Sequence, residues 1–322
     1  MMHKEISIQV GKKRIFFVCL MLVLLSAPMA GFCSAQSPFS IQFDSERLPW
    51  RRLSYKADNF FGKMTTDVRL EALSAKAAAD LLLPVPKMDG LQPSDATVIS
   101  ITADFNINPL IGPREILNTR SLCDPSDAAA LQIVRLRQGY KVWQKSYRFQ
   151  PDGVYHERKR PAGNRKQELP PNQWKTYEQR MYEFHPSRSE CPAVLEPSEL
   201  LYLASVVDFR GQKSPLNLCV FDQKQLHRIT MTAGGTRQLK VNYLEKSPGK
   251  QTRREGTVDV IKITFQPNIM GPADTKLEEF SFMGLQGDFE MYVDGATHIP
   301  VQVDGKLPGI GKLQLKLYKV EF

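Results

Sequence analysis

The chain lacks the residue spacings that mark well-known catalytic and metal sites. It has five histidines and five cysteines in 322 residues, and they form no His-Glu-x-x-His, His-x-His or Cys-x-x-Cys spacing. No Gly-x-Ser-x-Gly turn is present, and Gly234-Gly235 is not followed by the Lys-Ser/Thr of a phosphate-binding loop. The sequence therefore predicts a protein that is not an enzyme and that carries no cofactor and no metal ion.

Long hydrophobic runs are also scarce, and the longest lies near the N-terminus. Residues 15–25 are all apolar and follow four basic residues. A proline and small residues come next, with Cys33 and Ala35 at positions −3 and −1 of a cleavage site. A basic start, a short apolar run and a small-residue site are typical of an export signal. We expect residues 1–35 to be a cleaved signal peptide and residues 36–322 to be a single β-rich domain in the periplasm.

Two alternatives to a cleaved signal peptide are open. The first is an uncleaved anchor helix, for which the apolar run is short and is interrupted by Pro28. The second is lipid modification of Cys33, which usually requires a small residue just before the cysteine. Phe32 occupies that position, so cleavage is the preferred interpretation.

The excess of basic residues is modest. Residues 1–35 hold four of the 43 Lys and Arg and one of the 34 Asp and Glu, which leaves the remainder with a formal charge of +6. This is below the density expected of a nucleic-acid-binding protein, so we expect no nucleic-acid partner.

Two turns, residues 156–167 and 245–255, nevertheless concentrate basic side chains. Charged hairpin tips that prevent sheet aggregation are one interpretation, and contact with an anionic membrane surface or lipid head group is the other. The residues that would make such contact are Arg158, Lys159, Arg160, Arg165, Lys166, Arg253 and Arg254.

Three cysteines remain after residue 35: Cys123, Cys191 and Cys219. A disulfide can persist outside the cytoplasm, and an odd number leaves one thiol over. Cys123 and Cys191 lie in stretches that are typical of loops, whereas Cys219 lies in an apparent strand, where a buried free thiol is ordinary. The favoured hypothesis is a Cys123–Cys191 disulfide, although sequence alone does not determine the pairing.

Period-two alternation dominates the chain. From Met64 to Ala72 every second residue is apolar or threonine, with charged or polar residues between them. Residues 97–107 alternate in the same way, and turns such as Asp152-Gly153 and Asp294-Gly295 separate many such runs. Asp-Gly between alternating runs is a strong hairpin signal because such turns need positive φ. The pattern predicts ten or more antiparallel strands, and accumulated twist tends to curl a sheet of that size.

Two segments predict helices. Residues 74–83 are rich in alanine and leucine and end at Pro84, and residues 196–209 have Pro197 at a favourable first-turn position. Few other segments sustain a helical period. The expected fold is therefore mainly β: a curled antiparallel sheet or incomplete barrel with one or two short helices, one of which plugs or flanks the concave side.

The order of these pieces resembles a known family. The stretches "LSYKADNFFGKMTTDVRLEAL", "YRFQPDGVY", "EPSELLYLASVVDF" and "YVDGATHIPVQVDGKLPGIGKLQLKLYKVEF" follow one another along the chain. Over roughly residues 50–322 this resembles the exported bacterial family catalogued as domain of unknown function 3108. Asp294, Pro300 and Val301 match its closing hairpin, and residues 200–202 match its short helix. The basic turns, the three cysteines and the proline-rich stretch before the third predicted strand depart from the family pattern.

The resemblance implies no catalytic residues, because the family has none assigned. It also implies a likeness to curled antiparallel sheets that carry lipids or lipoproteins across the periplasm. That second step is an analogy of fold, and fold alone does not establish function.

Large apolar side chains raise the question of what the inner face covers. Packed core is the default for such residues, and a cavity for an acyl chain is the alternative, because ligand sites in curled sheets use the same inward positions. The candidate ligand-lining residues are Phe105, Ile107, Trp143, Tyr147, Phe149, Phe265 and Phe289.

The leading functional hypothesis is non-enzymatic binding of an apolar or amphipathic, lipid-like ligand in the cell envelope. The competing hypothesis is a structural or assembly partner of another envelope protein, with a fully packed interior. An enzyme with an unrecognised site is the third.

Overall fold

The structure is a computed structural model. It describes residues 49–59, 62–86, 89–109, 113–125, 128–139, 141–163, 169–184, 190–207, 209, 215–270 and 278–322. All of these residues belong to one compact unit. The signal-peptide prediction for residues 1–35 falls outside the described residues.

Most of the described chain is β-strand, and the strands form one sheet with β8 at one edge and β9 at the other. The strand order is β8-β7-β6-β5-β4-β3-β2-β1-β16-β15-β14-β12-β11-β10-β9, with β13 paired to β14. The strands are β1 (Arg52–Asn59), β2 (Gly62–Ser74), β3 (Thr97–Pro109), β4 (Glu115–Cys123), β5 (Ala130–Gln138), β6 (Trp143–Gln150), β7 (Gly153–Arg160), β8 (Lys175–Glu183), β9 (Val194–Leu195), β10 (Leu216–Asp222), β11 (Gln225–Ser247), β12 (Lys250–Met270), β13 (Ser281–Phe282), β14 (Leu285–Asp294), β15 (Pro300–Leu307) and β16 (Gly311–Glu321).

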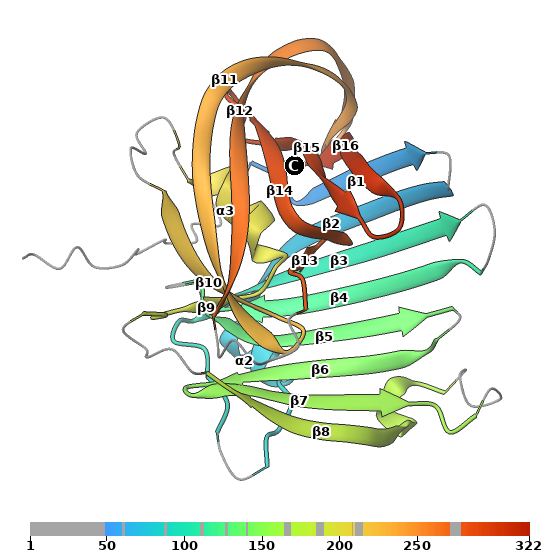
Figure 1. Cartoon of the computed structure of the whole chain (residues 1–322), viewed down its shortest axis with the longest axis vertical. Helices are drawn as coiled ribbons and strands as arrows, with labels where there is room; N and C mark the ends of the chain where they lie inside the picture. Colours follow the sequence, from blue (N-terminus) through green and yellow to red (C-terminus); the bar gives the residue numbers. More distant parts are fainter. Residues whose placement is uncertain are drawn as a thin grey trace, which may run out of the picture. The chain divides into compact units, whose positions relative to one another are not determined.

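The sheet curls far enough to close on itself along part of its length. β11 and β12 form a long hairpin, which curves over toward β15 and β16 in Figure 1. The end of β11 pairs in parallel with β16, with Leu244 opposite Lys319. The ring β16-β15-β14-β12-β11 is thereby closed, while β1 to β8 continue from the other edge of β16 as an open, antiparallel layer. The predicted curled antiparallel sheet is confirmed.

The two predicted helices are present and shorter than expected. α2 (Ala75–Ala79) begins after Ser74, whose side chain accepts a hydrogen bond from the Ala77 N–H at 3.2 Å. α3 (Glu199–Val206) begins at Glu199 rather than Glu196. Its residues from Glu199 to Ser205 are all buried, and it packs against β14 and β15 (Figure 1). A helix that is apolar all round belongs in an interior, and α3 fills part of the space inside the curl.

The hydrophobic core has a large cluster around α3, a smaller one beneath β5–β7, and a third made of Ala78, Val98, Leu122 and Leu131. The larger cluster includes the inward residues of β2, so the alternating segment found in the sequence covers packed protein over most of its length. A short 3-10 helix, η3 (Pro171–Gln173), lies before β8. In the smaller cluster, Phe221 of β10 meets Tyr147 and Phe149 of β6 edge-on, with ring centroids 5.9 and 5.8 Å apart. The two larger clusters pack the rest of the sheet against α3 and β10.

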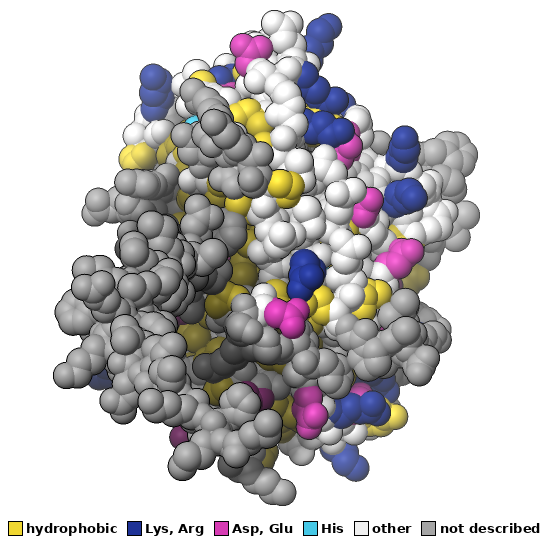
Figure 2. Space-filling model, turned by 60° about the vertical axis from the view of Figure 1, so that its left-hand side comes forward, with side chains coloured by type: hydrophobic (Ala, Val, Ile, Leu, Met, Phe, Trp, Pro, Cys, Tyr) yellow, Lys and Arg dark blue, Asp and Glu magenta, His cyan; other side chains and the backbone are white. Residues whose placement is uncertain are grey.

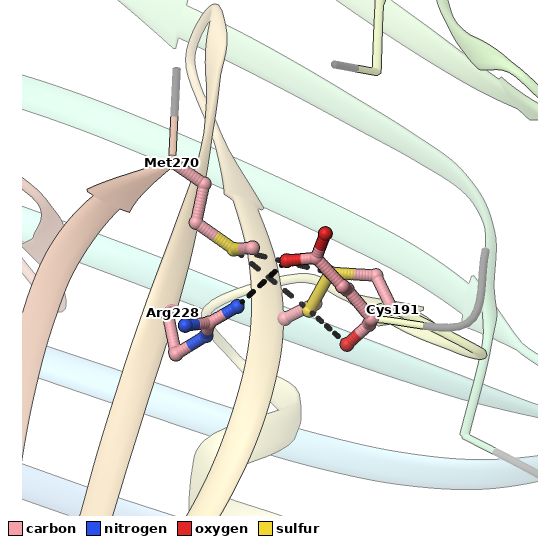
Figure 3. Close-up of a disulfide and its surroundings, with 5 residues drawn as sticks. Cys191, Arg228 and Met270 are labelled. Carbon is pink, nitrogen blue, oxygen red and sulfur yellow. Dashed lines mark hydrogen bonds and ion pairs between the residues drawn. A yellow bond between two sulfur atoms is a disulfide. The ribbon is translucent and has the colours of Figure 1, made fainter. Parts of the chain in front are cut away.

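The disulfide joins Cys191 to Cys219, so the predicted Cys123–Cys191 pairing is wrong (Figure 3). β9 pairs in parallel with β10, with Val194 opposite Cys219. This pairing brings Cys191, three residues before Val194, to a Cα–Cα distance of 5.7 Å from Cys219, within the range that a disulfide spans. Cys123 ends β4 as a buried free thiol whose Sγ lies 3.7 Å from the Ile99 carbonyl oxygen.

Candidate functional site

A cleft of about 430 Å³ opens on the inner face of β2–β7. Its opposite wall comes from the segment before α3, the turn after β10, and the β13–β14 turn. This volume falls within the range of small-molecule sites, about 300–1,000 Å³. We call it the inner cleft, and it is lined by Val68, Ala103, Phe105, Leu117, Thr119, Arg135, Arg137, Lys141, Trp143, Lys145, Arg158, Glu196, Pro197, Ser198, Leu201, Asp222, Gln223, Ser281, Phe282, Met283 and Gly284.

A smaller cavity of about 190 Å³ continues the inner cleft toward the start of β2 and the end of β3. The two share five lining residues, among them Phe105, Leu117 and Trp143. The far end of the smaller cavity is lined by Met64, Ile107, Ile116 and Glu115. The combined space is therefore elongated, and its far end is mostly apolar.

Strand register sorts the lining of the inner cleft by polarity. One row of directly opposed residues crosses six adjacent strands, and its members change from apolar to polar to basic. From β2 to β7 the row is Val68, Ala103, Thr119, Arg135, Lys145 and Arg158. Residues opposed in adjacent strands lie on the same face of the sheet. The inner face therefore offers an apolar half over β2–β4 and a cationic half over β5–β7.

The next row along the strands begins with two apolar residues and continues with an arginine and a tryptophan. Phe105 of β3 lies opposite Leu117 of β4, which lies opposite Arg137 of β5. Arg137 in turn lies opposite Trp143 of β6. The wall across the cleft adds apolar surface here, because Leu201 of α3 and Phe282 of β13 also line it.

Two of the cations in the cleft already have carboxylate partners. The Arg135 guanidinium lies 3.2 Å from Asp222 Oδ1, and both side chains are largely buried. Arg137 binds Glu115 at 2.6 Å in a more exposed pair. These contacts hold the two arginines in place, and they leave their charges largely neutralised.

Lys145 and Arg158 have no ion pair within the part of the chain that the structure describes. Arg158 Nε is buried and lacks a hydrogen-bond partner there. Both cations lie near the Trp143 ring instead, with Lys145 Nζ 4.9 Å and the Arg158 Cζ 6.0 Å from its centroid. Like charges placed directly opposite across strands destabilise a sheet. Glu278 and Glu178 favour the charged forms of Lys145 and Arg158, respectively, without forming an ion pair with them.

The electrostatic surroundings of these two side chains shift their pKa values. Burial, together with the positive charges of Arg158 and Arg135, lowers the pKa of Lys145 to about 8. Burial also lowers the pKa of Arg158, with a further contribution from Arg160. Burial is the larger cause of both shifts, and neighbouring positive charges add to it. A nearby anion would favour the charged form of each side chain.

A buried carboxyl group lies on the opposite wall. Glu196 is 1% exposed, lines the inner cleft, and its Oε1 lacks a hydrogen-bond partner among the described residues. Glu199, at the start of α3, accepts hydrogen bonds from the Ser121 hydroxyl at 3.2 Å and from the Glu196 N–H at 3.0 Å. Burial raises the pKa of Glu196 to about 7, against the lowering effect of Arg135, and burial beside Glu196 raises the pKa of Glu199.

We expect Glu196→Gln to stabilise the protein above pH 7 by on the order of 2 kcal/mol and to change little below pH 5. The unfolded carboxyl titrates near 4.5 and the folded one near 7, so the folded state binds more protons between these values. The stability contribution of Glu196 is therefore complete below pH 4.5 and is lost as pH rises to 7. Arg135, Asp222, Ser121 and Cys123 surround the coupled carboxyls of Glu196 and Glu199.

Urea unfolding of wild type and the glutamine variant at pH 5.0 and 7.5 measures this difference. The isosteric amide keeps the size of the side chain and removes only the charge. Equal unfolding free energies of the two proteins at both pH values would contradict the assignment of Glu196 as the titrating group.

The predicted ligand-lining residues divide into two sets. Phe105, Ile107 and Trp143 are half-buried and line the inner cleft or its extension. Phe265 and Phe289 stack at 4.5 Å in the larger core cluster, and Tyr147 and Phe149 belong to the smaller one. These four residues lie in packed protein and line neither cavity.

The predicted basic-surface residues also separate. Arg158 faces the inner cleft, whereas Lys159, on the other face of β7, pairs with Glu157 at 3.0 Å. Arg160 lies over the Tyr177 ring at 4.4 Å. Arg165 and Lys166 lie outside the described residues.

In the second basic turn, Arg254 pairs with Asp294 at 3.1 Å and with Glu245 at 3.5 Å. Arg253 lines a separate groove beside Lys56, Lys240 and Lys316. On the face shown in Figure 2, Lys and Arg side chains are scattered among Asp and Glu rather than gathered. The described members of the two turns therefore have different surroundings: the inner cleft for Arg158, the Tyr177 ring for Arg160, a separate groove for Arg253 and ion pairs for Arg254.

Sequence reasoning missed Arg135, Lys145 and Glu196. The sequence does place Arg135 and Lys145 in strand-like segments whose other residues alternate. The sequence does not give the strand register, which places Lys145 opposite Arg135 on one side and opposite Arg158 on the other. Glu196 is the first residue of the second predicted helical segment, and nothing in its local sequence indicates a cleft.

Among the described residues, no group of three His, Cys, Asp or Glu side chains is arranged to hold a metal ion. The helices within the described ranges are also too short or too polar to cross a membrane.

Comparisons with known proteins add little to this geometry. No family model matches the chain, and no curated protein matches it significantly. A similar solved structure is the crystal structure of a beta-barrel-like protein of domain of unknown function DUF1849 from Brucella abortus. It is 10% identical, covers 84% of this chain and 95% of its own, and superposes with a TM-score of 0.39. A likeness at that level carries no functional conclusion, and the resemblance to domain of unknown function 3108 stays a prediction.

Proposed function

We propose that this is an exported, non-enzymatic protein of the periplasm that binds an amphipathic, lipid-like ligand in the inner cleft. The observation that carries the proposal is the division of the cleft into an apolar half and a cationic half by strand register. An amphiphile has the same division between tail and head group.

The apolar half supplies the surface for a tail. Phe105, Leu117 and Phe282 line it, and the smaller cavity extends it toward Met64 and Ile107. Removing apolar surface from water yields about 25 cal/mol per Å², so filling this half with an acyl chain is favourable. The competing hypothesis of a fully packed interior is less well supported, because this space is not filled by side chains of the described residues.

Export is supported by the signal-like N-terminal sequence and is compatible with the Cys191–Cys219 disulfide. Disulfides persist in oxidising compartments and are rare in the cytosol. An anionic membrane surface remains a proposed contact, and another envelope protein remains the proposed partner under the competing hypothesis.

The test is to purify the exported protein, extract it with organic solvent and identify bound molecules by mass spectrometry. We expect a lipid-like molecule in near-stoichiometric amount. The Leu117→Trp variant should lose this molecule, because the larger tryptophan side chain fills the apolar half of the cleft. Thr102→Trp, on the opposite face of the neighbouring strand β3, is the matched control and should retain the ligand.

Retention of the ligand by the Leu117→Trp variant, or wild-type protein that is empty and instead captures a specific envelope protein, would overturn the proposal. Circular dichroism of both tryptophan variants must match wild type, so that loss of ligand is not a loss of fold.

A further inference from the structure

We infer that the cationic half of the inner cleft is a seat for a phosphate monoester head group, held between Lys145 and Arg158. This rests on the proposed function, because it names the head group of the amphiphile whose tail occupies the apolar half. The ligand class is a single-chain alkyl or acyl phosphate.

The geometry of three neighbouring strands carries the inference. Arg135, Lys145 and Arg158 lie directly opposite one another on β5, β6 and β7. Adjacent strands are about 4.8 Å apart, so one small anion between Lys145 and Arg158 reaches both. Asp222 already satisfies Arg135 at one end of the row, which leaves the other two positions for a ligand.

Charge count favours phosphate over carboxylate. Lys145 and Arg158 form no ion pair with a described carboxylate, although Glu278 and Glu178 act on them at longer range. Two such cations suit a ligand with about two negative charges. A phosphate monoester carries about −1.5 to −2 at pH 7 and three acceptor oxygens, whereas a carboxylate carries one charge on two oxygens. The additional oxygen has a donor available in Arg158 Nε, which is buried and without a hydrogen-bond partner among the described residues.

The two residue types suit this task differently. A guanidinium donates in a planar fork that matches phosphate oxygens, and an ammonium acts as a compact point charge. Trp143 lies beneath both cations and limits how far either side chain can move. An anion at this position would also relieve the repulsion between the two opposed positive charges.

The experiment compares four probes by isothermal calorimetry, with intrinsic tryptophan fluorescence as a second readout: dodecyl phosphate, dodecanoate, dodecanol and inorganic phosphate. For the exported protein stripped of bound lipid, we expect dodecyl phosphate to bind at least 10-fold more tightly than dodecanoate. Inorganic phosphate alone should bind at least 10-fold more weakly than dodecyl phosphate, because it lacks a tail.

Lys145→Gln and Arg158→Gln should each weaken dodecyl phosphate binding about 10-fold and leave dodecanol binding unchanged. Lys159→Gln is the matched control: it removes the same charge from the adjacent residue of β7, which faces away from the cleft and pairs with Glu157. It should bind every probe as wild type does.

The outcomes separate the two proposals. Equal affinity for all three dodecyl probes, unaffected by either glutamine variant, overturns the phosphate seat and leaves the amphiphile-binding proposal standing. Inorganic phosphate that binds as tightly as dodecyl phosphate supports the anion seat and overturns the lipid-like ligand. No binding of any probe overturns both.

Discussion

Replacing Arg148 by alanine is expected to lower the free energy of unfolding by about 3–5 kcal/mol. Arg148 of β6 is 1% exposed, and its guanidinium donates hydrogen bonds to the carbonyl oxygens of Leu131 at 2.7 Å and Phe149 at 3.4 Å, and also to that of Leu91. Truncation removes a donor from each of these carbonyls and opens a cavity, and both effects destabilise a folded protein.

Arg148 acts as a clasp between the sheet and the segment before β3. The Leu91 N–H donates to the Phe149 carbonyl at 2.8 Å, so the segment is held from both directions. A Cβ at Gly90 would lie 2.5 Å from Arg148 Cζ, which explains why glycine suits this position. These hydrogen bonds hold the segment before β3 against the C-terminal end of β6. The cationic half of the cleft lies nearer the other end of that strand.

Urea unfolding measures the effect, with Arg69→Ala as the control. Arg69 is an exposed arginine that pairs with Asp104 at 3.3 Å, and exposed pairs contribute about 0–1 kcal/mol. A loss below 1 kcal/mol for Arg148→Ala would show that water replaces its hydrogen bonds and that the clasp adds little to stability.

Loss of the Cys191–Cys219 disulfide is expected to cost about 3–4 kcal/mol. The two cysteines are 28 residues apart. A cross-link over a loop of that length lowers the conformational entropy of the unfolded chain, which stabilises the folded state by about this amount. The disulfide also joins the segment before β9 to β10 (Figure 3), and Cys219 lies three residues before Asp222 on that strand. The same change should therefore loosen one wall of the inner cleft.

The measurement is urea unfolding of the Cys191→Ser, Cys219→Ser double variant against wild type, each with and without reductant. Reductant should lower the stability of wild type to that of the double variant and leave the variant unaffected. Differential alkylation followed by peptide mass analysis identifies the free thiol, which should be Cys123. A free Cys219 in the folded protein would refute the pairing seen in the structure.

The disulfide shows where local sequence features mislead. Cys219 was interpreted as a buried strand thiol and Cys123 as a loop cysteine, since turn-like residues follow it. In the structure Cys123 ends β4 opposite Ile99, while the two-residue strand β9 brings Cys191 beside β10. A strand of two residues is too short to show period-two alternation, so the sequence does not predict the pairing of β9 with β10 or the disulfide that depends on it.

The candidate cleft was only partly predictable for a similar reason. Phe105, Ile107 and Trp143 were selected as large inward residues and do line the cavities. Phe265 and Phe289 have the same alternation and hydrophobicity, yet they stack on each other inside the closed ring. Alternation tells which face a side chain occupies, and it does not tell whether another layer fills the space above it.

The sequence by itself determined that this chain is mainly β, that its strands pair chiefly as antiparallel neighbours, and that two short helices interrupt them. These properties follow from local chemistry, since period-two alternation, Asp-Gly turns and a proline-led apolar segment each act over a few residues. Only the tertiary structure decided which side chains from distant strands share a surface. The opposition of Arg135, Lys145 and Arg158, the approach of Glu196 to the same cleft and the choice of disulfide all depend on register and curl, which are set by packing across the whole sheet.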